Sequence, residues 1–140
     1  MKRYIGTKII HAVPEVHGET GREGYVVRYA DGYESWSPKE AFEEAYRACD
    51  AMSFGLAIEA LKKGHKVARR GWNGKGMFLY YVPAASYPAQ RNTFGTMVGV
   101  FPDDMVPYCA YIAMKTAQDN VVPWLASQTD MLSDDWEIVQ

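Results

Sequence analysis

The sequence predicts an α+β protein, in which a small β module precedes a helix packed on an antiparallel sheet. Three observations predict this fold class. An Asp-Gly pair separates two aromatic, β-branched runs near the N-terminus, an amphipathic helical repeat begins after residue 51, and apolar runs of strand length follow that repeat. The 140 residues, 48% of them hydrophobic, suffice for one domain or for one domain with a small appendage. We therefore expect a β-hairpin and helix module over residues 1–48 and an α+β domain over residues 52–140.

The N-terminal module is expected to contain a strand over residues 8–13, followed by a hairpin. Asp31-Gly32 lies between the runs 24–29 and 33–36, and this pair is a strong short-range signal for a hairpin. Four aromatic side chains belong to this hairpin and form either the core of a minimal barrel or a binding face. They are Tyr25, Tyr29, Tyr33 and Trp36.

A short helix is expected to close the module. Ser37-Pro38-Lys39-Glu40 matches a helix start, with serine as the N-cap, proline in the first turn and glutamate completing a capping box. Phe42 and Tyr46 lie four residues apart on one face of this helix, so they should fold back onto the hairpin.

A second folding unit begins at Met52. Ser53 is a favourable N-cap, apolar residues recur at helical spacing from Phe54 to Leu61, and Gly64 follows two lysines, as is usual at a helix end. Strands should follow and build an antiparallel sheet of about four strands. The candidate strands are 65–70, 77–82, 108–115 and 136–139, and residues 121–124 follow a turn at 116–120.

Two other segments of this unit have their own signatures. Ser127-Gln128-Thr129-Asp130 is a second capping box, which predicts a short helix through Leu132. Residues 84–107 contain three prolines and show no clear periodicity, so they are expected to be a lid, a partner contact or short helices.

Composition and charge exclude several classes of protein. A formal charge of −2 argues against a non-specific nucleic-acid binder, which needs a basic surface. No apolar run reaches the length of a membrane span, and no signal peptide is evident, so the expected compartment is the cytoplasm. The two cysteines and three histidines lack metal-ligand spacing, and no metal or cofactor is predicted.

The most unusual stretch runs from Arg69 to Met77, where a tryptophan lies among three glycines. Trp72 can stack on a base, the two arginines before it can bind phosphate, and the amide of Asn73 can read a base edge. Glycines such as Gly74 let a ligand approach the backbone closely. The alternative is a glycine-rich turn with the indole of Trp72 placed in the core.

Catalytic motifs are not apparent in the sequence. It lacks a nucleophile elbow and a phosphate-binding loop. The acid pairs Asp103-Asp104 and Asp134-Asp135 are more typical of solvated or capping residues than of an acid–base pair. A binding site is better supported, because Trp124, like Trp72, lies in a turn beside small polar residues. Trp136 lies in strand register and is expected in the core.

Three motifs in order resemble a phage protein family, the type-two Thoeris anti-defence proteins, over about residues 52 to 139. The first is the helix start 52–61, the second is the Arg-x-Gly-Trp-Asn-Gly loop within 67–77, and the third is the Trp-x-x-Ser-Gln-x-Asp turn within 123–132, followed by Asp134-Asp135-Trp136. The resemblance implies a non-enzymatic sponge with no catalytic residue. Such proteins bind a cyclic ADP-ribose isomer (glycocyclic ADP-ribose), made by bacterial TIR-domain enzymes, and keep it from its effector in the host cytoplasm.

The resemblance also implies homo-oligomers, expected as tetramers, with ligand pockets at protomer boundaries. From the loop motif it carries over Trp72, Asn73 and Gly74 as ligand-binding residues. From the turn motif it carries over five more, namely Trp124, Ser127, Gln128, Thr129 and Asp130. The physical character of the loop adds Arg69 and Met77.

Two other functions stay open, and so does the role of the N-terminal extension. A hydrolase of cyclic nucleotides or NAD derivatives would use Asp130 and Asp135 as acid and base. An adaptor that inhibits a host defence protein would use Tyr33, Trp36 and the 84–107 segment. Residues 1–51 extend beyond compact members of the family, and a second site for another cyclic nucleotide is left open.

Overall fold

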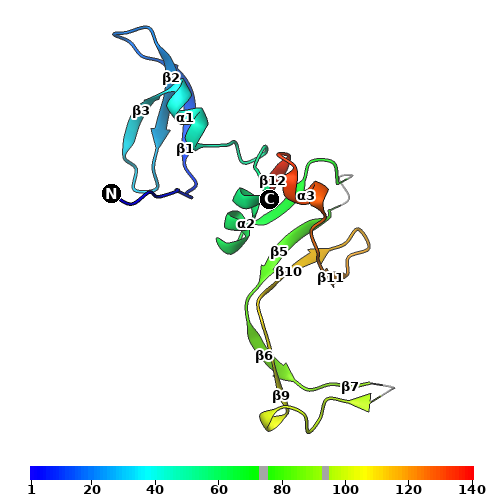
Figure 1. Cartoon of the computed structure of the whole chain (residues 1–140). Helices are drawn as coiled ribbons and strands as arrows, with labels where there is room; N and C mark the ends of the chain where they lie inside the picture. The colour runs from blue at the N-terminus through cyan, green and yellow to red at the C-terminus, as the bar shows by residue number, and fades with distance from the viewer. Residues whose placement is uncertain (73–75, 93–94) are drawn as a thin grey trace. The chain divides into compact units, whose positions relative to one another are not determined.

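A computed structural model of the chain, shown in Figure 1, describes residues 1–72, 76–92 and 95–140. They form two units, Met1–Ala51 and Met52–Gln140. Each unit combines an antiparallel sheet with at least one helix, so the predicted α+β fold class is confirmed. Over the described ranges, no helix is both long enough and apolar enough to cross a membrane.

The first unit is a three-stranded antiparallel sheet with one helix. Its elements are β1 (His11–Val16), β2 (Glu23–Arg28), β3 (Glu34–Pro38) and α1 (Lys39–Ala45), and β2 is the central strand. The predicted Asp31-Gly32 hairpin is confirmed. Gly32 takes a φ of 89°, and the Asp31 carboxylate accepts a hydrogen bond from the backbone N–H of Tyr33 at 2.9 Å.

The start of α1 corrects one prediction. Ser37 was expected to cap the helix, but it still belongs to β3 and pairs with Tyr25, and α1 begins only after Pro38. The proline ring disfavours helical backbone in the residue before it, so Ser37 stays extended. The predicted packing of the helix is confirmed, because the rings of Phe42 and Tyr25 stack with centroids 4.0 Å apart, and Tyr46 stacks on Phe42.

Gly24 in β2 allows the ring of Trp36 to lie directly on the backbone. The indole N–H of Trp36 donates to the carbonyl of Glu15 across the sheet at 2.9 Å. A Cβ at Gly24 would lie 2.3 Å from the carbonyl oxygen of Ser37 and 2.4 Å from the Trp36 ring. This is too close for any side chain, so the strand tolerates only glycine here.

We therefore expect Gly24→Ala to destabilise the first unit by about 1–3 kcal/mol or more, the range for overpacking a filled site. Limited proteolysis read by mass spectrometry should show faster cleavage within residues 1–51 and unchanged cleavage within 52–140. Gly18→Ala is the matched control, because a Cβ at Gly18 would meet no heavy atom of the described residues within 4 Å. A wild-type digestion pattern for Gly24→Ala would contradict the close packing of Trp36.

The second unit is built on a five-stranded antiparallel sheet, one strand more than the approximate number expected. The order across the sheet is β11-β10-β5-β4-β12, with β4 and β5 adjacent as predicted. The segment 121–124 and the closing segment 136–139 form the two edges. The strands are β4 (Lys66–Arg69), β5 (Phe78–Val82), β10 (Tyr111–Lys115), β11 (Val121–Pro123) and β12 (Trp136–Val139).

The helix α2 (Phe54–Lys62) packs on this sheet and forms the core with it. Its N-terminus is capped as predicted, because the hydroxyl of Ser53 accepts a hydrogen bond from the N–H of Leu56 at 3.3 Å. The buried face of the helix contributes Leu61, which packs with Val67 of β4 and Leu79 of β5. These three side chains are at most 1% exposed.

Residues 84–107 were expected to be a lid, a partner contact or short helices, but the described part of this segment contains short paired strands and one 3₁₀ turn. β6 (Ala85–Pro88) pairs with β9 (Met105–Tyr108), β7 (Arg91–Asn92) pairs with β8 (Gly95–Thr96), and a 3₁₀ turn, η1 (Pro102–Asp104), precedes β9. Figure 1 shows the β6–β9 ribbon continuing from the ends of β5 and β10, away from α2. A ribbon exposed on both faces needs no alternation of apolar and polar residues, so periodicity could not predict it.

Candidate functional site

Three tryptophans from different segments meet beside the N-terminus of α2. Trp72 follows β4, Trp124 follows β11 and Trp136 opens β12. The ring centroids of Trp72 and Trp136 are 5.5 Å apart, those of Trp72 and Trp124 are 6.3 Å apart, and those of Trp124 and Trp136 are 5.9 Å apart, all in edge-to-face geometry. Phe54 of α2 adds a fourth ring at 5.4 Å from Trp136. We call Trp72, Trp124, Trp136 and Phe54 the tryptophan cluster.

Burial separates the members of the tryptophan cluster into two kinds. Trp136 is 0% exposed, which confirms its predicted place in the core. Trp72 and Trp124 are half-buried and pack against the core without belonging to its fully buried centre. The indole of Trp72 is therefore supported by the cluster and still keeps surface in contact with solvent.

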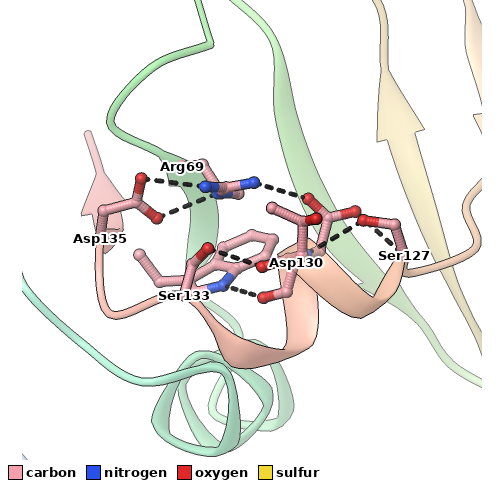
Figure 2. Close-up of polar contacts among 7 residues, drawn as sticks. Arg69, Ser127, Asp130, Ser133 and Asp135 are labelled. Atoms are coloured by element: carbon pink, nitrogen blue, oxygen red, sulfur yellow. Dashed lines mark hydrogen bonds and ion pairs between the residues drawn. The ribbon is translucent and has the colours of Figure 1, made fainter.

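Beside the tryptophan cluster, Arg69 lies between two carboxylates (Figure 2). Its Nη1 donates to Asp130 Oδ1 at 3.0 Å, its Nε to Asp135 Oδ1 at 3.0 Å and its Nη2 to Asp135 Oδ2 at 3.3 Å. The side chains of Arg69, Asp130 and Asp135 are 20%, 16% and 32% exposed, so this network is partly shielded from water. The hydrogen bonds to Asp135 and Asp130 raise the pKa of Arg69, which keeps its charge. We call this arrangement the Arg69 fork.

The helix α3 (Gln128–Leu132) begins with the predicted capping box. The Ser127 hydroxyl accepts from the N–H of Asp130, and the Asp130 carboxylate accepts from the N–H of Ser127, both at 3.0 Å. The indole N–H of Trp136 donates to the Asp130 carbonyl at 2.9 Å. One residue of α3 thus connects the helix cap, the Arg69 fork and the tryptophan cluster.

The structure brings together five of the ten predicted site residues. Arg69, Trp72, Trp124, Ser127 and Asp130 meet in the tryptophan cluster and the Arg69 fork. Gln128 and Thr129 are exposed on the first turn of α3, next to this group, and Met77 is half-buried at the start of β5. Asn73 and Gly74, which the sequence also indicated, lie outside the described residues.

Sequence reasoning missed the role of Asp135. The pair Asp134-Asp135 was expected to be solvated or capping, but the carboxylate of Asp135 binds both Nε and Nη2 of Arg69. Trp136 pairs with Arg69 in the β12–β4 ladder, which brings the preceding Asp135 beside the arginine. The sequence did show an acidic residue directly before the closing strand. Assigning it to Arg69 required knowing that β12 pairs with β4.

The Asp130 carboxylate is poorly suited to acid catalysis near neutral pH. Burial raises the pKa of Asp130, but hydrogen bonds from Ser127 and Arg69 outweigh burial, and the pKa lies below its ordinary value. A general acid needs the opposite shift. Within the described ranges, no group of three or more His, Cys, Asp or Glu residues is placed to hold a metal ion.

The second unit also contains a small apolar pocket, between α2 and the ends of β5 and β10. Its volume is about 130 Å³, less than the roughly 300 Å³ of the smaller ligand pockets in proteins. Ile58, Tyr81 and Tyr111 are among its lining residues, and the tryptophans are not. This pocket therefore does not coincide with the predicted site.

The low pKa of Asp130 predicts a loss of stability in acid. The folded protein holds the carboxylate ionised to lower pH than the unfolded chain does, so the unfolded state binds more protons as the pH falls. The contribution of Asp130 should be complete above the unfolded pKa of about 3.9 and should vanish as the pH falls through the folded value.

Urea unfolding at about pH 7 and about pH 3 can test this expectation. Asp130→Asn should lower the stability at neutral pH by about 1–3 kcal/mol and should lose less stability on acidification than wild type. Asp103→Asn, a change at an exposed carboxylate of η1, is the control. Its free energy of unfolding should change between the two pH values as that of wild type does. Equal acid sensitivity of Asp130→Asn and wild type would remove Asp130 as the cause.

Comparison with known proteins agrees with this arrangement. A family model described as Tad2-like, Thoeris anti-defense 2-like domain, matches residues 52–139. The Thoeris anti-defense 2 protein of Bacillus phage SP01 is 44% identical over 88 residues, which are 63% of this chain and 94% of that protein. The matched segment contains the whole tryptophan cluster and the Arg69 fork, and it leaves residues 1–51 outside. The chain belongs to the Tad2-like family of Thoeris anti-defense proteins.

Proposed function

We propose that this protein captures a cyclic ADP-ribose signal, glycocyclic ADP-ribose, made by bacterial TIR-domain enzymes, and holds it without cleaving it. Capture in the host cytoplasm would keep the signal from the effector that it activates. Membership of an anti-defense family supports this proposal. The chemical nature of the site supports it as well, because aromatic rings and polar groups lie side by side there.

The half-buried indole of Trp72 is the observation that carries the proposal. Trp136 and Trp124 pack against it in edge-to-face geometry, so the ring is held in place before any ligand arrives. A planar heterocycle such as adenine stacks favourably on a ring that needs no rearrangement. The exposed first turn of α3, with Gln128 and Thr129, supplies polar groups near this ring. Asn73 and Gly74 remain ligand contacts in the proposal, on the basis of the loop motif.

A sponge must bind tightly, and this requirement favours a site shared by several copies. Capture of a signal present below micromolar concentration needs a dissociation constant near nanomolar, or roughly −12 kcal/mol. Such affinity calls for a site that encloses the ligand, and in a symmetric oligomer two chains can supply the walls of one cavity. We propose a homotetramer with the ligand at protomer boundaries.

The β6–β9 ribbon supports self-association. Tyr87 and Tyr108 are 51% and 50% exposed, and every residue of β6 is exposed in the isolated chain. A two-stranded ribbon is at best marginally stable in water by itself. Packing against another copy would bury these aromatic side chains and hold the ribbon in place.

Binding without turnover is consistent with the state of the nearby carboxylates. Both carboxylate oxygens of Asp130 accept hydrogen bonds, and both oxygens of Asp135 contact Arg69. An acid–base pair for hydrolysis would need one of these groups to carry a transferable proton. The proposal therefore assigns no catalytic residue.

Native mass spectrometry of the protein incubated with a TIR-enzyme reaction mixture tests the proposal. We expect a tetramer with bound ligand whose mass equals that of cyclic ADP-ribose. Heat release followed by chromatography should return the same intact compound. Release of linear ADP-ribose, one water heavier, would instead show hydrolysis, and a protein without bound small molecule would favour a protein-binding adaptor.

A further inference from the structure

The Arg69 fork joins three parts of the second unit that are distant in the sequence. Arg69 ends β4, Asp130 lies in the first turn of α3, and Asp135 precedes β12. All three guanidinium nitrogens donate to these two carboxylates, as Figure 2 shows. A planar guanidinium can fix two acceptors in direction as well as in distance, which an ammonium group cannot do.

Backbone hydrogen bonds to Arg69 and Asp135 hold the start of the turn that carries Trp72. The carbonyl of Arg69 accepts a hydrogen bond from the N–H of Trp72 at 3.1 Å. The N–H of Arg70 donates to the carbonyl of Asp135 at 3.0 Å. The position of Trp72 therefore depends on the same two residues whose side chains form the ion pair.

A second path leads from the Arg69 fork to the same indole. Asp130 binds Arg69 with its carboxylate and accepts from the indole N–H of Trp136 with its carbonyl. The ring of Trp136 then packs against Trp72. Arg69, Asp130, Trp136 and Trp72 thus form a closed ring of contacts, so a displacement of the fork would reach Trp72 from two directions.

We infer that Arg69 is a positioning residue, which places the Trp72 indole and the first turn of α3 for the ligand without contacting the ligand itself. The inference rests on the proposed function, because it assigns a role within that site. It departs from the expectation that Arg69 and Asp130 bind the ligand directly. Nε, Nη1 and Nη2 each already donate to a carboxylate, so a ligand that took over one of these hydrogen bonds would leave a partly buried carboxylate less well paired, which is unfavourable.

A double-mutant cycle between Arg69→Lys and Trp72→Ala tests the inference by calorimetric titration with the purified cyclic ADP-ribose isomer. Arg69→Lys keeps the charge and loses the fork. It should weaken binding by about tenfold to a hundredfold, as small displacements of a binding group do. In the Trp72→Ala background the same change should cost clearly less, because one of the two groups that Arg69 positions is already absent and only the first turn of α3 remains.

The control is Arg28→Lys in the first unit, where Arg28 forms an exposed ion pair with Glu34 through Nε and Nη2. It should change the affinity by less than about twofold. Equal losses for Arg69→Lys with and without Trp72 would overturn the inference, because they would show a direct ligand contact. Unchanged affinity of the folded Arg69→Lys protein, with only a lower melting temperature, would overturn it as well.

Hydrogen–deuterium exchange without ligand gives a readout that does not depend on the proposed function. Arg69→Lys should accelerate exchange of the Trp72 amide and of the α3 amides, while α2 exchanges as in wild type. Equal exchange at Trp72 in both proteins would overturn the inference. If wild type fails to bind the ligand, the proposed function fails, and this exchange measurement still decides whether Arg69 holds the turn.

Discussion

Trp72→Ala should weaken the proposed capture of a cyclic ADP-ribose signal by about a hundredfold while the second unit remains folded. Stacking of a base on an aromatic side chain contributes about 1–3 kcal/mol, and the upper end of this range corresponds to a hundredfold change. The indole of Trp72 is half-buried and held by Trp136 and Trp124, so it provides a stacking surface at little entropic cost.

The stability cost of the same change should be modest. Trp72 meets the tryptophan cluster in edge-to-face contacts, and each such pair is worth about 0.5–1.5 kcal/mol beyond the buried area. The fully buried Trp136 stays in place beneath it. Thermal unfolding should therefore show a lowered but cooperative transition for the variant.

Isothermal titration of Trp72→Ala measures the expected loss of affinity. Trp72→Phe should bind with intermediate affinity, because a smaller ring still stacks. Tyr33→Ala removes an aromatic that is 65% exposed in the first unit and should bind as wild type does. Wild-type affinity for Trp72→Ala would remove Trp72 from the site and, with it, the central support for the sponge proposal.

Trp136→Ala should destabilise the second unit by about 3–5 kcal/mol, the range for truncating a large buried aromatic side chain. Trp136 is the largest fully buried side chain of the protein's described part. Its backbone N–H and carbonyl both pair with Met52, and its indole N–H binds the Asp130 carbonyl. The substitution would leave a cavity between α2 and the sheet and an unsatisfied carbonyl at α3.

Guanidinium unfolding followed by circular dichroism measures this loss, and Trp136→Phe separates its two causes. Phenylalanine fills much of the volume but cannot donate a hydrogen bond, so it should cost only part of the alanine effect. Cleavage of residues 1–51 by protease should not change in either variant, because those residues form the other unit. A loss below about 1 kcal/mol for Trp136→Ala would show that the core does not depend on this ring.

Elements specified by neighbouring residues could be predicted from the sequence. The caps of α2 and α3 depend on contacts three residues apart, and the Asp31-Gly32 turn depends on two residues. Ser37 shows the limit of such local rules. Its sequence context matches a helix cap, but in the structure it belongs to the strand β3, which ends at Pro38. Local patterns therefore fail where two of them overlap.

The candidate site could be predicted only in part. Trp72 and the Ser127–Asp130 turn were accessible because each motif is contiguous. The Arg69 fork was not, because its acceptors lie 61 and 66 residues further along the chain and depend on the pairing of β4 with β12. The exposed β6–β9 ribbon was also missed, since one chain offers it no buried face from which a pattern could arise.

The separation between Arg69 and its acceptors determines how the site can be lost. A protease cut anywhere from residue 70 to residue 129 places the guanidinium and both of its carboxylates on different fragments. Neither fragment then contains a complete support for the indole. Competence to hold a ligand is therefore a property of the whole unit, gained and lost together with its cooperative folding.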